Sequence, residues 1–199
     1  IDGMVAKTER EKINVFPVYE VNGDVDYKTG NIDFVGTVVI RGNVLTGFRV
    51  KAGGDIRIIG GVEGAEIEAE GSVEITGGIM AGNKGAVKAG RNVRCSFIQD
   101  GNVFAGEDII VSQSIMHSNI RAARSVICYG AKGLIVGGSI QAGEKVRART
   151  IGNTLSTATT IEVGVAPELR YELTQLRTQQ RQQSENLDKT NKALALLDQ

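Results

Sequence analysis

The chain has 199 residues, and its 23 basic and 23 acidic side chains give a formal charge of zero. This balance lacks the basic excess that attracts nucleic acid or an anionic membrane, and no apolar run approaches the roughly 18 residues that span a bilayer. Neither nucleic-acid binding nor membrane insertion is therefore expected, and two cysteines with one histidine are too few for a structural zinc site.

Residues 1–30 are predicted to form strands. Apolar and polar residues alternate between Ile13 and Val21, and the pairs Asn22-Gly23 and Thr29-Gly30 are typical of turns. We expect this segment to cap the domain that follows it. An uncapped end would expose unpaired strand groups that promote filament growth.

Residues 31–164 repeat one short template. Each copy has an apolar residue, a polar residue, an alanine, a turn rich in Gly, Asn, Asp or Ser, and a second apolar-polar-apolar alternation. The six clear copies begin at Val50, Ile67, Val87, Val103, Ile120 and Ile140, and a weaker one begins at Ile32. A further apolar position recurs between copies, as at Val44, Val62, Ile79 and Ile115.

Alternation with a period of two predicts short strands, and three such strands in about 17 residues must stack on neighbouring copies to bury a core. The fold class predicted is all-β, a parallel β-helix (solenoid) of about seven coils with a long C-terminal α-helix. The intervals between copies vary from 16 to 20 residues. Because a left-handed hexapeptide helix keeps to multiples of six, we expect a right-handed solenoid.

The template assigns the inward side chains. Ala52, Ala69, Ala89, Ala105, Ala122 and Ala142 share one inward position, which Phe34 occupies in the weak first copy. Cys95 and Cys128 share another register and should be buried two coils apart, roughly 9 to 10 Å by strand spacing. That separation is beyond the reach of a disulfide, so both are predicted to be packing thiols.

The outward positions change character along the chain. Two ladders of alternating charge are predicted early, Lys51 with Glu68 and Lys88, and Arg57 with Glu74 and Arg94. Further along, the same ladders carry Phe104, Ile110 and Ile127, which we interpret as candidate interaction residues. The alternative is that a terminal segment of the same chain covers them.

No catalytic, cofactor-binding or metal-binding residue is predicted, and no enzyme activity is expected. His117 is the only imidazole and is interpreted as a turn residue, and the glycine-rich insertions Gly82-Asn-Lys-Gly85 and Gly130-Ala-Lys-Gly133 lack the Ser or Thr and the helix of a phosphate-binding loop. A solenoid lyase, glycosidase or acyltransferase remains a less favoured alternative, because such enzymes need clustered outward acids or bases on one face.

Residues 165–199 have a different period. Glycine disappears, and an a/d seam with spacings of three and four indicates a helical coiled-coil arm. The seam comprises Leu169, Leu173, Leu176, Gln180, Gln183, Leu187, Thr190, Leu194 and Leu197. A helix with so narrow a stripe needs a partner, either a second copy of the chain or a returning helix. The six leucines are candidate interaction residues.

Several strings resemble the flagellar assembly protein A (FapA) family of bacterial β-solenoids. The strings are Val21-Asn-Gly-Asp-Val-Asp-Tyr-Lys-Thr-Gly-Asn-Ile32-Asp-Phe34, Val62-Glu-Gly-Ala65, Met116-His-Ser118, Lys132-Gly-Leu-Ile-Val-Gly-Gly138 and Ile161-Glu-Val-Gly164. The resemblance implies a right-handed β-helix, a coiled-coil tail, a cytoplasmic location and a role connected with flagellar assembly or placement. It implies no catalytic residue.

Together these features favour a non-enzymatic scaffold that binds protein partners, including a second copy through the C-terminal helix. The alternative is a self-assembling cytoskeletal element of the bactofilin type, in which rods join end to end.

Overall fold

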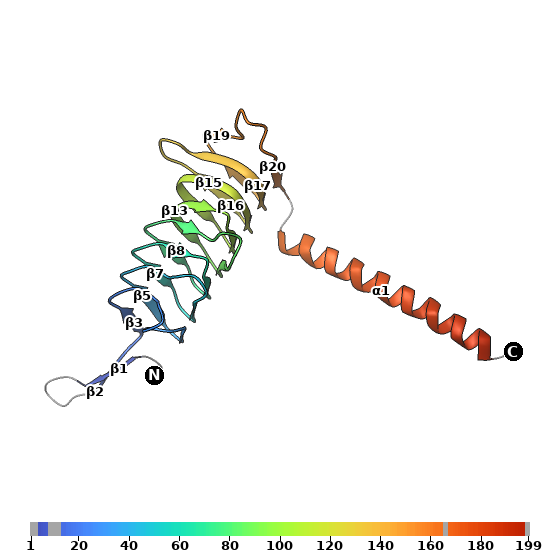
Figure 1. Ribbon diagram of the computed structural model, residues 1–199, viewed down its shortest axis with the longest axis horizontal. Helices are drawn as coiled ribbons and strands as arrows, with labels where there is room; N and C mark the ends of the chain where they lie inside the picture. The colour runs from blue at the N-terminus through green and yellow to red at the C-terminus, as the bar shows by residue number, and fades with distance from the viewer. Residues whose placement is uncertain (1–3, 8–12, 165–166, 198–199) are drawn as a thin grey trace.

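The computed structural model describes residues 4–7, 13–164 and 167–197, and most of the described chain is a parallel β-solenoid (Figure 1). The solenoid has about eight turns, and a single helix, α1 (Pro167–Leu197), follows it. No helix within these ranges is long and apolar enough to cross a membrane.

Each turn contributes one short segment to each of three parallel sheets. The first sheet contains β3 (Val18–Val21), β5 (Thr37–Ile40), β7 (Ile56–Ile58), β10 (Val73–Ile75), the start of β13 (Val93–Gln99), the start of β15 (Ile109–Ala122), β16 (Ser125–Cys128) and β18 (Lys145–Arg147). The second contains bridges at Val25 and Val44, then β8 (Val62–Glu63), β11 (Ile79–Met80), the end of β13, the middle of β15, the start of β17 (Leu134–Ala142) and β19 (Thr150–Ile151).

The third sheet carries the repeated alanines. It contains β4 (Ile32–Phe34), β6 (Arg49–Ala52), β9 (Glu66–Ala69), β12 (Ala86–Ala89), β14 (Asn102–Ala105), the ends of β15 and β17, and β20 (Thr159–Val163). The strand pairs of all three sheets are parallel, because each strand meets its equivalent one turn later.

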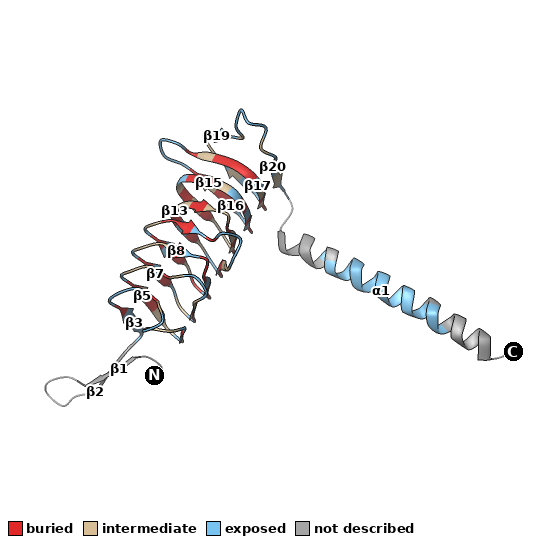
Figure 2. Cartoon of the chain, viewed as in Figure 1, coloured by how far each residue is buried: buried red, intermediate tan, exposed pale blue. Residues whose placement is uncertain are grey.

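The core is a stack of aliphatic side chains along the inside of the solenoid (Figure 2). The apolar residue between template copies supplies the second sheet, where Val62 pairs with Ile79 and Ile98 with Ile115, all at most 1% exposed. The period-two pattern therefore places every second side chain of each short strand in one continuous core.

The alanine position is confirmed as a ladder. Ala69 pairs with Ala89, which pairs with Ala105, and all three are buried. The following corner is equally tight, since a Cβ added to Gly106 would collide with the carbonyl oxygen of Gly90. Only small residues fit where the backbones of successive turns approach this closely.

The solenoid begins earlier in the chain than predicted. The template predicts about seven coils starting at residue 31, whereas β3 pairs in parallel with β5, so the ladder begins at Val18. At the other end β20 pairs with β17 and completes the last turn inside the predicted range of residues 31–164. The template is hard to recognise in β3 because Tyr19 replaces the usual aliphatic residue.

The segment before Val18 forms strands, as expected, but these pair with each other. β1 (Met4–Lys7) and β2 (Ile13–Phe16) make an antiparallel two-stranded sheet that is separate from the solenoid. The two glycine-rich insertions are lateral turns between strands of the solenoid.

Enlarging an alanine in the ladder should destabilise the fold. Ala105 is fully buried between Ala89 and Ala122, so Ala105→Leu should cost about 1 to 3 kcal/mol by overpacking and lower the thermal midpoint by roughly 2 to 4 °C per kcal/mol. Lys88→Leu, at an exposed outward position of the adjacent strand, is the control and should change the midpoint little. If the two variants unfold at the same temperature, the tight packing of the alanine ladder at Ala105 is contradicted.

Candidate interaction surface

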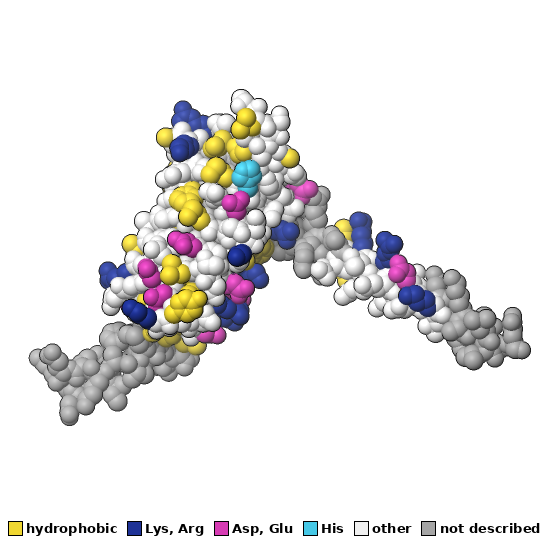
Figure 3. Space-filling view, in the orientation of Figure 1, with side chains coloured by type: hydrophobic (Ala, Val, Ile, Leu, Met, Phe, Trp, Pro, Cys, Tyr) yellow, Lys and Arg dark blue, Asp and Glu magenta, His cyan; other side chains and the backbone are white. Residues whose placement is uncertain are grey.

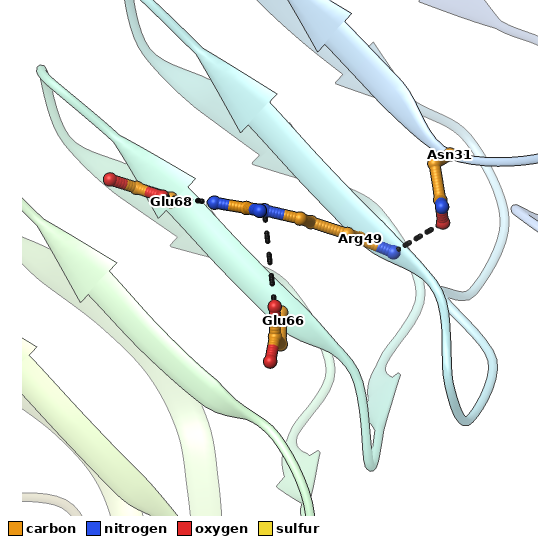
Figure 4. Close-up of polar contacts among 4 residues, drawn as sticks. All are labelled: Asn31, Arg49, Glu66 and Glu68. Atoms are coloured by element: carbon orange, nitrogen blue, oxygen red, sulfur yellow. Dashed lines mark hydrogen bonds and ion pairs between the residues drawn. The ribbon is translucent and has the colours of Figure 1, made fainter.

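The early outward ladders are held by ion pairs between turns. Arg57 Nε lies 3.0 Å from Glu74 Oε2 on the first sheet. On the third sheet Arg49 Nη2 lies 3.0 Å from Glu68 Oε2, and its backbone N–H donates to Asn31 Oδ1 at 2.9 Å (Figure 4). The hydrogen bond from Arg49 lowers the pKa of Glu68. These partly exposed pairs favour the register of successive turns.

The first-sheet ladder then becomes apolar. Along this ladder Arg94 pairs with Ile110, Ile110 pairs with Ile127, and Ile127 pairs with Arg147. Ile110 and Ile127 are half-buried on the outside of the sheet. The predicted juxtaposition is therefore confirmed, and two branched aliphatic side chains lie side by side where the earlier turns carry a salt bridge.

A depression of about 360 Å³ adjoins Ile110. Ile110, Ser112 and Tyr129 line one part of it, and Glu74 and Arg94 line another. Tyr129 is 54% exposed. An exposed tyrosine beside an apolar wall and a charged edge resembles the composition of protein interfaces, where aromatic residues and arginine are enriched. The sequence pattern missed Tyr129 because it lies in a corner, outside the repeated strand positions.

Phe104 lies on a different face from Ile110 and Ile127. It is a half-buried, outward residue of the third sheet, and its ladder neighbours are Lys88 and Arg121. The structure thus separates Phe104 from the isoleucine pair. Flanked by two cationic side chains, it interrupts the charge ladder without forming a continuous apolar patch with the first sheet.

The seam of α1 is open to solvent where its side chains are described. Leu173 is 48% exposed, Leu176 is 55% and Leu187 is 62%, and Gln180 and Gln183 are exposed as well. The side chains of Leu169, Leu194 and Leu197 lie outside the described residues. The leucine stripe does not cover Ile110 and Ile127, because a covering helix would bury its own leucines.

The two cysteines are buried in one register, as predicted. Cys95 pairs with Val111, and Val111 pairs with Cys128, so the two thiols lie two turns apart with Val111 between them. Both are free. Burial raises the pKa of Cys95 to about 12 and that of Cys128 to about 11. Thiols this difficult to ionise act as packing groups.

His117 is exposed and occupies a corner between the second and third sheets. Its φ of 49° is close to that of Asp100, φ 50°, one turn earlier. The neighbouring hydroxyl of Ser118 donates to the carbonyl oxygen of Met116 at 2.6 Å and accepts from the N–H of Gly101 at 3.2 Å. Left-handed corner residues of this kind shape the turn, and the Ser118 hydroxyl is engaged by backbone groups.

Within the described residues, no three or more His, Cys, Asp or Glu side chains lie close enough together to hold a metal ion. The Gly82-Asn-Lys-Gly85 insertion forms a turn in which Lys84 N–H bonds the carbonyl oxygen of Ala81 at 2.8 Å. Asn83 and Gly85 adopt positive φ there, at 60° and 74°.

The comparison with protein families gives one match. The family described as the Flagellar Assembly Protein A beta solenoid domain matches residues 17–199, which includes all of the solenoid and α1. No curated protein and no solved structure matches the chain significantly.

Both thiols should react slowly in the folded protein. With pKa values of about 12 and 11 against 9.0 for a free thiol, the thiolate fraction at pH 8 falls by at least about a hundredfold, and the buried sulfurs are also shielded. A chromogenic disulfide reagent should therefore modify neither cysteine promptly until denaturant is added, when two thiols should be released. Prompt modification of native protein would contradict the packing role.

Proposed function

Since the chain belongs to the flagellar assembly protein A family, we propose that it is a non-enzymatic scaffold that binds protein partners during the assembly or placement of flagella. The proposal places it in the cytoplasm and includes a right-handed winding of the solenoid. Its basis is the combination of a rigid rod with exposed apolar residues at defined outward positions.

The observation that carries the proposal is the change in the first-sheet ladder. Arg57 and Glu74 form an ion pair, whereas the equivalent positions later in the ladder carry Ile110, which lines the 360 Å³ depression, and Ile127 beside it on the next strand. A salt bridge at such a position is well solvated by water. An isoleucine pair, by contrast, is stabilised when its apolar surface is removed from water. A protein partner that buries these side chains and Tyr129 would provide that environment.

The chemistry of the described residues supports a binding role over catalysis. The Ser118 hydroxyl is hydrogen-bonded to backbone groups, and the Cys95 and Cys128 thiols have raised pKa values. These groups lack the activation that a serine or cysteine nucleophile requires, which is an adjacent base or a lowered pKa.

The helix supports a second point of attachment. The exposed leucines of α1 lie at a and d positions of a coiled coil, and we propose that they pair with another helix. The glutamines at positions 180 and 183 occupy the middle of the same seam. Polar residues in a seam lower the stability of the pairing, so the association should be modest.

Charging the isoleucine pair should abolish function without unfolding the protein. In a bacterium that lacks its own copy, the wild-type chain should restore flagellar number and position, scored by electron microscopy, and the double variant Ile110→Lys with Ile127→Lys should not. Both side chains are only half-buried, so the unfolding midpoint should stay near wild type.

The matched control is Val39→Lys with Ile59→Lys. Val39 is half-buried and Ile59 is 47% exposed, and both lie in the N-terminal half of the solenoid. This control should restore flagella. Normal flagella in the strain without the protein would refute the flagellar role. Full restoration by the variant with lysines at positions 110 and 127 would refute partner binding through Ile110 and Ile127.

The alternative of end-to-end filaments rests on the open strand edges at the last turn. Rods that join through their ends should appear as long particles in electron micrographs, whereas a scaffold should give discrete particles with the length of one or two solenoids. Filaments at micromolar concentration would favour the cytoskeletal role.

Pairing through α1 should depend on its seam. Sedimentation equilibrium of the full chain at micromolar concentration should show a monomer in exchange with a dimer, and Leu187→Asp should weaken the dimer about tenfold or more, because a charge would enter an apolar interface. Gln182→Asp adds the same charge at an exposed position outside the seam and should have little effect. A wild-type chain that stays monomeric would contradict self-pairing and favour a returning helix.

A further inference from the structure

The last turn of the solenoid exposes its strand edges. β18, β19 and β20 each pair on one side with the preceding turn, and no pairing to a further strand is found within the described ranges. An uncovered edge presents a row of free backbone N–H and C=O groups. These groups can accept an additional strand.

The core is also incompletely covered at this end. Val146 and Ile161 continue the inward stacks of Val126 and Ile140, yet both are only half-buried, whereas Val126 and Ile140 are fully buried. Ile151 is 53% exposed although its partner Ile135 is fully buried. An added layer with apolar side chains would complete all three stacks.

The two ends of the solenoid differ in this respect. In the first turn Tyr19 and Phe34 occupy the core positions, with ring centroids 5.7 Å apart, and Val25 and Ile32 are buried. The N-terminal end is therefore closed by its own aromatic side chains. The C-terminal turn has small and aliphatic residues at the equivalent positions and remains open.

Positive charge gathers around the open end (Figure 3). Lys132, Lys145 and Arg147 are exposed and form no ion pair among the described residues, and the guanidinium of exposed Arg149 donates to the carbonyl oxygen of Ala131 at 3.2 Å. This contrasts with the early turns, where outward cations alternate with carboxylates.

The acids near this end already have partners. Glu144 Oε1 lies 3.7 Å from Arg124 Nε, and Glu162 Oε2 accepts from Gln141 Nε2 at 2.9 Å. The Gln141 amide is neutral, so Glu162 keeps its negative charge, but the four basic residues at positions 132, 145, 147 and 149 outnumber it and the open end is basic overall. It complements carboxylates supplied from outside the chain.

We propose that the C-terminal turn binds an extended acidic segment of another protein as an additional β-strand. The free edge of β18 provides the backbone partners, its half-buried Val146 packs against the apolar side chains of the added strand, and the basic residues 132, 145, 147 and 149 attract the acidic ones. This site lies at the last turn, where Arg147 follows Ile127 on the first sheet, whereas Ile110 and Ile127 belong to the two preceding turns.

A second copy is a poorer fit than an acidic segment. The N-terminal turn carries acids, but Glu20 pairs with Arg41, Asp24 accepts from the N–H of Asn43 at 2.7 Å, and Asp26 accepts from backbone N–H groups of its own turn. These carboxylates are engaged within the chain. At that end the rings of Tyr19 and Phe34 already cover the buried Val25 and Ile32.

The test uses the full chain and three labelled peptides of equal length in fluorescence anisotropy. One alternates glutamate with valine, one alternates lysine with valine, and one alternates glutamate with proline, which cannot donate the backbone hydrogen bonds of a strand. The first should bind and the other two should not. Equal binding of both acidic peptides would overturn strand addition, because charge alone would then suffice.

Charge reversal at the last turn locates the site. Lys145→Glu with Arg147→Glu should weaken binding of the glutamate-valine peptide about tenfold or more. Lys28→Glu with Lys84→Glu makes the same change in net charge at exposed positions elsewhere and should leave binding within about twofold. Circular dichroism should show that both variants unfold at the wild-type temperature.

Three further outcomes would overturn the proposal. The first is an equal loss of binding in both charge variants. The second is binding to phosphatidylserine vesicles but not to the peptide, which would assign the basic end to a membrane. The third is growth of the chain into long particles that the peptide does not shorten, which would assign the end to a second copy.

Discussion

Every turn of this chain must return to the register of the turn before it. A strand has a period of two, so a slip of one residue would move the aliphatic side chains outward and the charged ones into the core. The alanine ladder enforces this register at the tightest place, since Ala69, Ala89 and Ala105 lie directly on one another. The insertions are confined to turns, where added residues do not disturb the pairing.

The constant register makes the outer surface a set of ladders in which each face has its own chemistry. Ion pairs such as Arg57 with Glu74 occupy the early turns and lie at exposed positions, where they contribute little energy but favour correct stacking. Once the core fixes the stack, the outward positions are free to change. Ile110 and Ile127 therefore occupy salt-bridge positions without loss of the fold, and a rigid backbone holds them at a fixed spacing.

The sequence predicted the residues of the ladders better than the ends of the solenoid. Ile110 beside Ile127, and Cys95 in one register with Cys128, follow from counting along the template, because the same number of strand positions separates equivalent residues. Residues 18–30 were expected to be part of a cap because Tyr19 does not fit the template. Tyr129 was missed because corners do not follow the period, and its place at the depression depends on how the chain bends there.

The sequence by itself determined the solenoid, the inward alanines, the change from charged to apolar outward residues and the heptad seam of the final helix, because each is a matter of period. The tertiary structure decided that the ladder begins at Val18 and that aromatic residues close the first turn. It also decided that the last turn has a free strand edge with basic residues near it. The physical reason is that a period describes what successive turns share. The ends differ because each has only one neighbouring turn, so their burial and pairing depend on the assembled rod.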